Sequence, residues 1–267
     1  MILVTGATGT IGSHVARLLT ERGVPFRAMS RRRRPGGVRA DFDDPASLAR
    51  AVADVDAVFL VTVPPVPSAE HDIALIAAAR AAGVRRIVKL SAIGSGERFE
   101  GTTVGAWHVA AEEAIEASGL GWTMLRPPSF ASNLLWHRAL IRAGEPVPNL
   151  AGDSRQAVVD PRDVAAVAVA ALTDGAHEGR RYDLTGPTPL TFADQVAILG
   201  GVLGRRIGIA DVDGLDRLPA GVATGVRWAR SGAAAYVTDH VPRVLGRPAG
   251  TFERWARDHR EAFTAPG

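Results

Sequence analysis

The segment Thr5-Gly-Ala-Thr-Gly-Thr-Ile-Gly12 decides the fold, because it places a glycine-rich turn between a strand and a helix. The preceding Ile2-Leu3-Val4 is a short apolar run typical of a buried strand, and apolar residues recur at helical spacing over Thr10 to Glu21. The first glycine permits a tight turn, the second lets the backbone approach a pyrophosphate, and the third lets the helix pack on the strand. Free N–H groups at the start of such a helix bind anions. The segment therefore predicts a dinucleotide site, with a Gly-x-x-Gly-x-x-Gly spacing one residue longer than the usual fingerprint.

Composition narrows the class of protein. A chain of 267 residues with 46% hydrophobic residues can form one large α/β domain, or one domain with a smaller lobe. It has no cysteine, which excludes disulfides, thiolate metal sites and cysteine nucleophiles and fits a reducing cytoplasm. The longest apolar stretch, Val164 to Leu172, is far shorter than the roughly 20 residues of a membrane span. No signal-type leader precedes the first strand, so we expect a soluble cytoplasmic protein without membrane contact.

Strand-like and helix-like segments alternate over the first half of the chain. Further apolar runs occur at Phe26 to Ser30, Ala57 to Val63, Arg86 to Leu90 and Trp122 to Leu125. Alanine-rich helical stretches separate them, at Pro45 to Ala53, Ala69 to Ala82 and Val104 to Ser118. This alternation predicts an α/β fold with a doubly wound parallel sheet of the Rossmann type.

After residue 127 the alternation of strand-like and helix-like segments becomes less regular. We expect helices near 130–143, 162–173, 191–200, 215–235 and 251–263, and strands at 156–159 and 181–184. The predicted organisation is a cofactor-binding domain over 1–150, with returns at about 156–185, and a small, mostly helical substrate-side lobe over 186–267. No linker is long enough to separate independent domains, so both belong to one structural unit.

Cofactor choice depends on the end of the second strand, which reads Ser30-Arg31-Arg32-Arg33-Arg34. An acidic residue there would bind the ribose hydroxyls of NAD, whereas a basic one accepts the 2'-phosphate of NADP. Arg31 is the best candidate for that phosphate, and NADP(H) is the predicted cofactor. The four arginines lack interleaved aromatics and a basic helix face, which disfavours a nucleic-acid partner. Asp41 could accept a hydrogen bond from the adenine amino group, or serve only the start of the next helix.

Several motifs together resemble the NmrA-like branch of atypical short-chain dehydrogenases. They are the glycine segment, Arg31, the run Asp41-Phe42-Asp43-Asp44-Pro45-Ala-Ser-Leu, Lys89-Leu90-Ser91-Ala92, Trp107-His108-x-x-Ala111-Glu112-Glu113, Trp122-Thr-Met-Leu-Arg126-Pro127 and Val159-Asp160-x-x-Asp163-Val-Ala. The resemblance covers almost the whole chain and is strongest up to about residue 185. It implies NADPH lying across the strand ends, with Thr62 and Val63 at the ribose and Pro127, Ser129 and Phe130 at the nicotinamide. The full set of expected cofactor contacts is Gly6, Thr8, Gly9, Thr10, Ile11, Gly12, Ser30, Arg31, Asp41, Phe42, Thr62, Val63, Ser91, Pro127, Ser129 and Phe130.

The chain departs from the short-chain dehydrogenase pattern at the Tyr-x-x-x-Lys pair, in which the phenol protonates a developing alkoxide. Alignment on Ala111-Glu112 puts Val104 at the tyrosine position and His108 at the lysine position. Three explanations remain open. The substrate could be a quinone or enone that needs no strong acid, His108 or His137 could supply the proton, or the protein could sense redox state without turnover. His108 could also pair with Glu112 one turn later, and Ser91 could either bind a substrate carbonyl or cap a strand.

The leading prediction is an NADPH-dependent oxidoreductase that delivers hydride to a carbonyl, enone or quinone of an apolar, aromatic small molecule. Mostly apolar side chains would form its pocket, namely Trp107, Phe130, Asn133, Trp136 and Trp228. The alternative is an NADP(H)-binding redox sensor that acts as a regulator. His108 and Glu112 are too few to ligate a metal, so none is expected. The sequence leaves the oligomeric state open.

Overall fold

The structure is a computed structural model that describes residues 1–32 and 35–264. The chain forms two compact units, each made of several segments. The first comprises Met1–Gly96, Gly105–Arg126 and Val164–Asp183, and the second comprises Glu97–Val104, Pro127–Asp163 and Leu184–Gly267. The assignment of cofactor binding to one part of the chain and substrate binding to another stays a prediction.

The first unit is built on one parallel sheet of seven strands in the order β10-β8-β5-β4-β1-β2-β3. The strands are β1 (Ile2–Val4), β2 (Phe26–Ser30), β3 (Gly37–Arg39), β4 (Ala57–Leu60), β5 (Arg86–Leu90), β8 (Gly121–Arg126) and β10 (Arg180–Asp183). The four residues of β4 are all buried, as expected for a parallel strand covered on both faces. The predicted doubly wound parallel sheet is confirmed.

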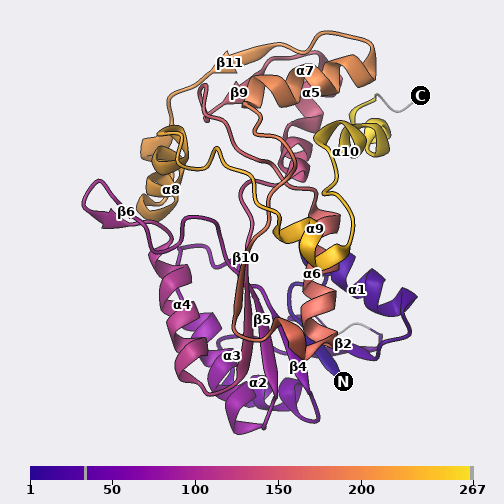
Figure 1. The fold of residues 1–267 in the computed structure, drawn as a ribbon, viewed down its shortest axis with the longest axis vertical. Coiled ribbons are helices and arrows are strands. Elements are labelled where there is room, and N and C mark those ends of the chain that lie inside the picture. Colours follow the sequence, from indigo (N-terminus) through magenta and orange to yellow (C-terminus); the bar gives the residue numbers. More distant parts are fainter. Residues whose placement is uncertain (33–34, 265–267) are drawn as a thin grey trace. The chain divides into compact units, whose positions relative to one another are not determined.

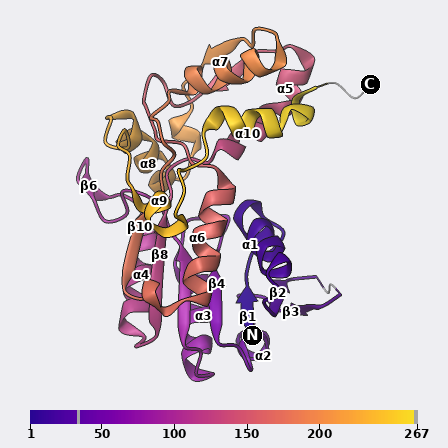
Figure 2. The same ribbon diagram turned by 45° about the vertical axis from the view of Figure 1, so that its right-hand side comes forward.

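Helices cover both faces of this sheet: α1 and α6 lie on one side, and α2, α3 and α4 lie on the other (Figures 1 and 2). Their bounds are α1 (Thr10–Glu21), α2 (Pro45–Val52), α3 (Glu70–Ala81), α4 (Ala106–Ala117) and α6 (Pro161–Thr173), with a short 3₁₀ turn, η2 (Gly175–His177). The core beneath α2, α3 and α4 contains Leu48, Leu75 and Ile115, which pack on Leu3 and Ile87 of the sheet.

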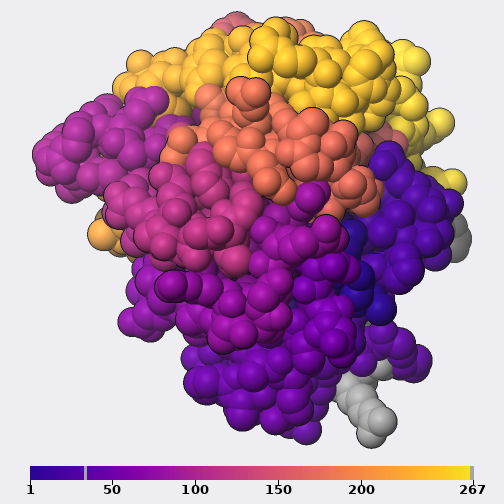
Figure 3. All heavy atoms as spheres, turned by 60° about the horizontal axis from the view of Figure 1, so that its bottom comes forward, coloured from indigo at the N-terminus to yellow at the C-terminus, as the bar shows by residue number. Residues whose placement is uncertain are grey.

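The strand order reverses between β1 and β4. From β1 the chain proceeds to β2 and β3 on one side, and from β4 to β5, β8 and β10 on the other. Ligands of such sheets bind beyond the carboxyl ends of the strands at this reversal. In Figure 3 the lower part of the view is formed mostly by atoms of the N-terminal third of the chain (indigo to purple).

The second unit contains short elements of mixed type. They are β6 (Arg98–Phe99), β7 (Thr102–Thr103), η1 (Ala131–His137), α5 (Arg138–Ala143), β9 (Val147–Asn149), α7 (Phe192–Leu203), β11 (Ile209–Asp211), η3 (Leu215–Arg217), α8 (Ala220–Arg230), α9 (His240–Leu245), α10 (Phe252–Asp258) and η4 (Arg260–Phe263). Its core joins η1, α5, α7 and α10 around Trp255, which is 1% exposed. None of the helices described by the structure is long and apolar enough to span a membrane.

Three helices expected in this part of the chain are each divided. The segment 130–143 forms the 3₁₀ helix η1 and then α5, and 251–263 forms α10 and then η4. His259 follows α10, and its ring Nδ1 lies 2.8 Å from the carbonyl of Trp255, so the side chain meets a backbone group of the last turn. In 215–235, Pro219 lacks an N–H and precedes α8, which is why the helix does not extend back to η3.

The prediction of a strand at 156–159 is also wrong. Gln156 pairs antiparallel with Leu190, whereas Val159 pairs parallel with Phe130. Because the two ends of the segment bond to different partners in opposite directions, no continuous ladder forms.

Candidate functional site

The glycine segment forms a tight turn between β1 and α1, as predicted. Gly6 has a φ of +57°, and a Cβ at this position would lie 2.6 Å from Val61 Cγ1. A Cβ on Gly12 would lie 2.2 Å from the carbonyl oxygen of Gly6. The third glycine therefore lets α1 pack against the turn itself, where we expected packing against the strand.

The start of α1 suits an anion. Gly9 is the N-cap residue, no side chain of the described residues caps the helix, and the first turn holds no acidic residue. Thr8, Gly9 and Thr10 are exposed, while Ile11 is buried. The N–H groups of this turn and the positive end of the helix dipole therefore face solvent at the carboxyl end of β1, which fits the pyrophosphate of a dinucleotide.

Thr5 ties this turn to the neighbouring strand. Its buried hydroxyl lies 3.1 Å from the carbonyl oxygen of Phe59 and 2.9 Å from that of Val61, and it accepts from the Val61 N–H at 2.8 Å. The glycine turn and the segment after β4 are thus held together at the reversal of strand order.

The residues expected at the adenosine end lie after β2 and β3. Ser30 accepts a hydrogen bond from the Arg32 N–H at 3.1 Å, and Arg31 is exposed; Arg33 and Arg34 lie outside the described residues. Phe42 is partly exposed and stacks on His71 of α3, with ring centroids 5.1 Å apart.

The three acidic residues of the segment 41–44 make different contacts. Asp44 is the N-cap of α2 and accepts from the Ser47 N–H at 3.1 Å, as a helix start requires. Asp43 instead lies 3.0 Å from His71 Nε2. Asp41 is partly exposed, and among the described residues its carboxylate accepts a local bond from the Asp43 N–H at 3.3 Å, which leaves acceptor capacity for a ligand.

Thr62 and Val63 follow β4 and differ in exposure. Val63 is 91% exposed. Thr62 is partly exposed, and its hydroxyl lies 2.6 Å from Asp72 Oδ2 on α3. The other oxygen of Asp72 accepts from Lys89 Nζ of β5 at 2.5 Å, and both charged side chains are at most 2% exposed.

A second buried carboxylate lies at the ends of β5 and β8. Glu112 of α4 accepts from the Ser91 hydroxyl at 2.5 Å and from Arg126 Nε at 3.0 Å, and it also bonds to Arg126 Nη2. The hydroxyl proton of Ser91 is therefore directed at Glu112. In this arrangement Ser91 can accept a hydrogen bond from a ligand but has no proton left to donate to a carbonyl.

The pairing considered between His108 and Glu112 is not formed. His108 Nδ1 is buried and has no hydrogen-bond partner in the described part of the chain. Burial, together with the charges of Lys89 and Arg126, lowers the pKa of His108 to about 3. The ring is consequently neutral at ordinary pH. Trp107 is partly exposed, and its ring lies 4.9 Å from that of His108.

Sequence reasoning missed both ion pairs, although each left a signal. Lys89 is the only lysine of the chain and interrupts an otherwise apolar strand. Glu112 and Arg126 both stand in the motifs that carry the family resemblance, but their spacing does not reveal that they meet.

The remaining predicted site residues belong to the second unit. Pro127 is buried, and Ser129 donates to Gln156 Oε1 at 2.7 Å. Phe130 precedes η1 and is partly exposed, as is Asn133 within it.

The predicted aromatic and histidine positions of this unit differ widely in exposure. Trp136 is 76% exposed, whereas Trp228 is 4% exposed and donates its indole N–H to Glu97 Oε2 at 2.8 Å. His137 packs edge-on against Phe192 at 5.8 Å, and burial lowers its pKa.

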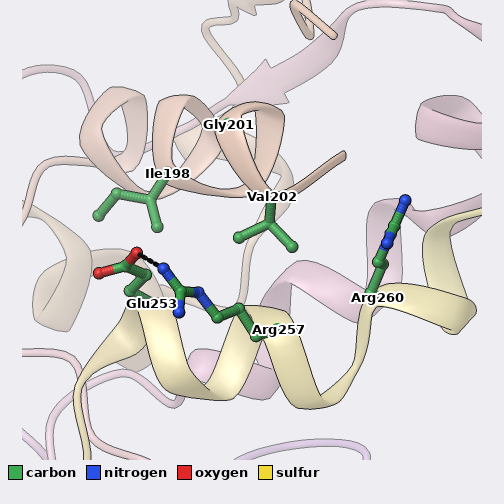
Figure 4. Close-up of a pocket in the computed structure, with 6 residues that line it drawn as sticks. All are labelled: Ile198, Gly201, Val202, Glu253, Arg257 and Arg260. Atoms are coloured by element: carbon green, nitrogen blue, oxygen red, sulfur yellow. Dashed lines mark hydrogen bonds and ion pairs between the residues drawn. The ribbon is translucent and has the colours of Figure 1, made fainter. Parts of the chain in front are cut away.

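A hollow in the second unit contains none of the predicted site residues. Ile198 and Val202 point from α7 toward α10, where Glu253 and Arg257 form an ion pair (Figure 4). Its lining consists of Ile198, Gly201, Val202, Glu253, Arg257 and Arg260. Among residues 1–32 and 35–264, no cluster of His, Cys, Asp and Glu could hold a metal ion.

Comparison with known proteins agrees with this geometry. A family model described as NAD(P)H-binding matches residues 6–175. The chain is 42% identical to a (4-alkanoyl-5-oxo-2,5-dihydrofuran-3-yl)methyl phosphate reductase of Streptomyces griseus, over 98% of this chain and 99% of that protein. It is 36% identical to an NAD(P)H azoreductase of Xenophilus azovorans, over 99% and 100% of the two chains. A crystal structure of an NADPH-dependent quinone oxidoreductase from Escherichia coli, complexed with NADPH, matches with a TM-score of 0.80 at 25% identity, covering 97% of this chain and 99% of that one.

The seven-stranded parallel sheet has a glycine turn after its first strand, and no side chain in the described part of the chain caps the helix that follows this turn. These features define a dinucleotide-binding protein of the Rossmann class. The chain belongs to the NAD(P)H-binding family and is a reductase of the NmrA-like, atypical short-chain dehydrogenase type. The predictions of a nicotinamide dinucleotide cofactor and of an NAD(P)H-dependent oxidoreductase are confirmed.

Proposed function

We propose that this protein uses NADPH to reduce a quinone or a conjugated enone on an apolar small molecule. The observation that carries the proposal is the lack of a proton donor where short-chain dehydrogenases place their tyrosine. Our alignment on Ala111-Glu112 puts Val104 at that position, and Val104 is 3% exposed. His108, at the lysine position, has a pKa of about 3, and the Ser91 proton is directed at Glu112.

The missing proton donor indicates which kind of hydride acceptor the protein can reduce. Hydride addition to a simple ketone forms an alkoxide that needs an acid, whereas addition to a quinone or enone forms a delocalised oxyanion. Positioning and electrostatic stabilisation are then enough, and solvent supplies the proton. Three relatives are named for unsaturated acceptors: an azoreductase, a quinone oxidoreductase and the reductase of an alkanoyl-substituted oxo-dihydrofuran.

The cofactor part of the proposal assigns roles to residues of the first unit. The bound cofactor supplies the hydride. The turn from Gly6 to Gly12 would hold its pyrophosphate, and exposed Arg31 would bind the 2'-phosphate that distinguishes NADP from NAD. Asp41 and Phe42 would contact the adenine, and Thr62 a ribose. Contacts of Pro127, Ser129 and Phe130 with the nicotinamide stay part of the proposal.

A panel of acceptors tests this function. The purified protein is mixed with NADPH and, in separate reactions, with menadione, 1,4-naphthoquinone, cyclohexenone or cyclohexanone, and absorbance at 340 nm is followed. We expect NADPH oxidation with the quinones and the enone and none with cyclohexanone, after subtraction of a reaction without protein. Reduction of cyclohexanone, or cofactor binding without oxidation by any acceptor, would contradict the proposal.

A further inference from the structure

A chain of two hydrogen bonds runs from the interior of the first unit to its cofactor edge. Lys89 Nζ donates to Asp72 Oδ1 at 2.5 Å, and the Thr62 hydroxyl lies 2.6 Å from Asp72 Oδ2. Lys89 and Asp72 are buried, whereas Thr62 is partly exposed. The three residues come from β5, α3 and the segment after β4, so they connect three elements around β4, one of the two strands between which the strand order reverses.

The buried charges fix the direction of the outer hydrogen bond. Asp72 forms an ion pair with the ammonium group of Lys89, and a carboxylate in an ion pair can only accept hydrogen bonds. The Thr62 hydroxyl must for this reason donate its single proton to Asp72. Toward a ligand, Thr62 Oγ1 presents only lone pairs and acts solely as an acceptor.

The position of Thr62 indicates which part of the cofactor it would meet. Sheet order places β4 on one side of β1 and β2 on the other. If Arg31 at the end of β2 binds the 2'-phosphate, the adenosine ribose lies toward β2 and the second ribose lies toward β4. The N–H and the carbonyl oxygen of Val61 both contact the Thr5 hydroxyl, so the backbone just before Thr62 is tied to the end of β1.

We infer that Lys89 and Asp72 are positioning residues that hold Thr62 as an obligate acceptor for a hydroxyl group of the nicotinamide-side ribose. The inference rests on the proposed function, because it takes Thr62 to line the cofactor. A ribose hydroxyl donates into this arrangement, while a phosphate or carbonyl oxygen at the same place would meet only lone pairs.

The test is a double-mutant cycle on cofactor affinity. Thr62→Val removes the hydroxyl and keeps the shape, and Thr62→Ser keeps the hydroxyl. Because removal of one charge would leave the other buried and unpaired, Lys89→Gln and Asp72→Asn are introduced together. Calorimetry gives the Kd of each variant for NADPH and for adenosine 2',5'-bisphosphate, which lacks the second ribose. Thermal unfolding reports stability separately.

We expect Thr62→Val to weaken NADPH binding about tenfold and Thr62→Ser to change it little. The neutralised pair should weaken NADPH binding by a similar factor and add little in the Thr62→Val background, because both changes remove one interaction. Adenosine 2',5'-bisphosphate should bind every variant as it binds the wild type. Unchanged NADPH affinity in Thr62→Val, additive effects, or a parallel loss for adenosine 2',5'-bisphosphate would each overturn the inference.

Failure of this inference is distinguishable from failure of the proposed function. If wild-type protein oxidises NADPH with quinones but the cycle shows no coupling, only the role of Lys89 and Asp72 is overturned. If the coupling is present but no acceptor is reduced, the proposed reduction is overturned and the positioning role stands.

Discussion

Both units contain buried carboxylates, but different groups donate hydrogen bonds to the carboxylates of the two units. In the first unit, Asp72 and Glu112 accept from the hydroxyls of Thr62 and Ser91, which follow the carboxyl ends of β4 and β5. In the second unit, Asp163 is 2% exposed and accepts from the Gly250 N–H at 2.6 Å.

The other contacts of the second unit have the same character. Asp163 pairs with Arg247 at 2.7 Å, and Asp160 pairs with Arg162, which reaches Asp258 of α10 at 2.6 Å. These bonds join segments of the chain to one another, and no hydroxyl at a strand end is held by them.

The contrast teaches that a buried carboxylate is not by itself a functional sign. Its meaning depends on the last group in its hydrogen-bond chain. Where that group is a hydroxyl that follows the carboxyl end of a strand in a parallel sheet, as in Thr62 and Ser91, a change in the network should alter ligand affinity. Where it is a backbone N–H or a surface arginine, the same change should alter stability alone.

The largest expected effect compares two glycines, one in each unit. Gly12→Ala would place a Cβ 2.2 Å from the Gly6 carbonyl oxygen, and Gly186→Ala would place one 2.0 Å from that of Val158. Backbone must move in both cases. We expect Gly12→Ala to weaken NADPH binding by roughly a hundredfold or more, because the displaced turn is the one that would hold the pyrophosphate.

Gly186→Ala should lower the melting temperature and leave the NADPH Kd of the folded protein unchanged. Gly201→Ala, in a helix and with no atom within 4 Å of the added Cβ, is the matched control: it should leave the NADPH Kd unchanged and raise the melting temperature slightly, because alanine is the better helix former. Calorimetric titration and thermal unfolding measure the two quantities. Normal NADPH binding by Gly12→Ala would break the comparison.

The next effect is on stability in the second unit. Asp163→Asn removes the ion pair with Arg247 and weakens the hydrogen bond from the Gly250 N–H, so we expect a loss of about 3 kcal/mol in the free energy of unfolding. The NADPH Kd should not change. Glu253→Gln, which breaks an exposed pair with Arg257, is the control and should cost less than about 1 kcal/mol in urea unfolding. A weaker NADPH affinity in folded Asp163→Asn would contradict the distinction between the units.

A smaller effect is expected on the affinity for NADPH relative to NADH when Arg31 of the first unit is changed. Arg31→Ala should raise the Kd for NADPH about tenfold or more and leave that for NADH unchanged, because a charged hydrogen bond to the 2'-phosphate is lost. The neighbouring exposed Arg32→Ala is the control. Equal losses for NADPH and NADH would place the effect in the shape of the loop.

The smallest effect concerns pH. His108 has a pKa of about 3 in the folded protein against 6.5 when unperturbed, so the unfolded chain takes up the proton more readily. Its contribution to stability is complete above pH 6.5 and is lost progressively as pH falls toward 3. Urea midpoints at pH 7.5, 6 and 5 should therefore decline less steeply in His108→Gln than in the wild type. An identical slope in the two proteins would show that the ring is not held neutral.

Much of the first unit could be predicted from local patterns. The strands Phe26–Ser30 and Arg86–Leu90 begin and end where the apolar runs do, and the glycine turn lies between β1 and α1 as expected. Predictions were poorer in the second unit, where helices divide and Gln156 and Val159 bond to different partners. There the ends of elements depend on distant contacts more than on periodicity.

The sequence by itself determined the class of fold and the place of the dinucleotide turn, because a glycine turn and buried strands are set by short-range sterics and burial. Only the tertiary structure decided the partners of the charged groups. Spacing along α4 suggested that Glu112 would meet His108, yet packing brings it Ser91 from 21 residues away and Arg126 from 14. A buried carboxylate requires the strongest donors within reach, and which donors are within reach is known only once β5, β8 and α4 are packed together.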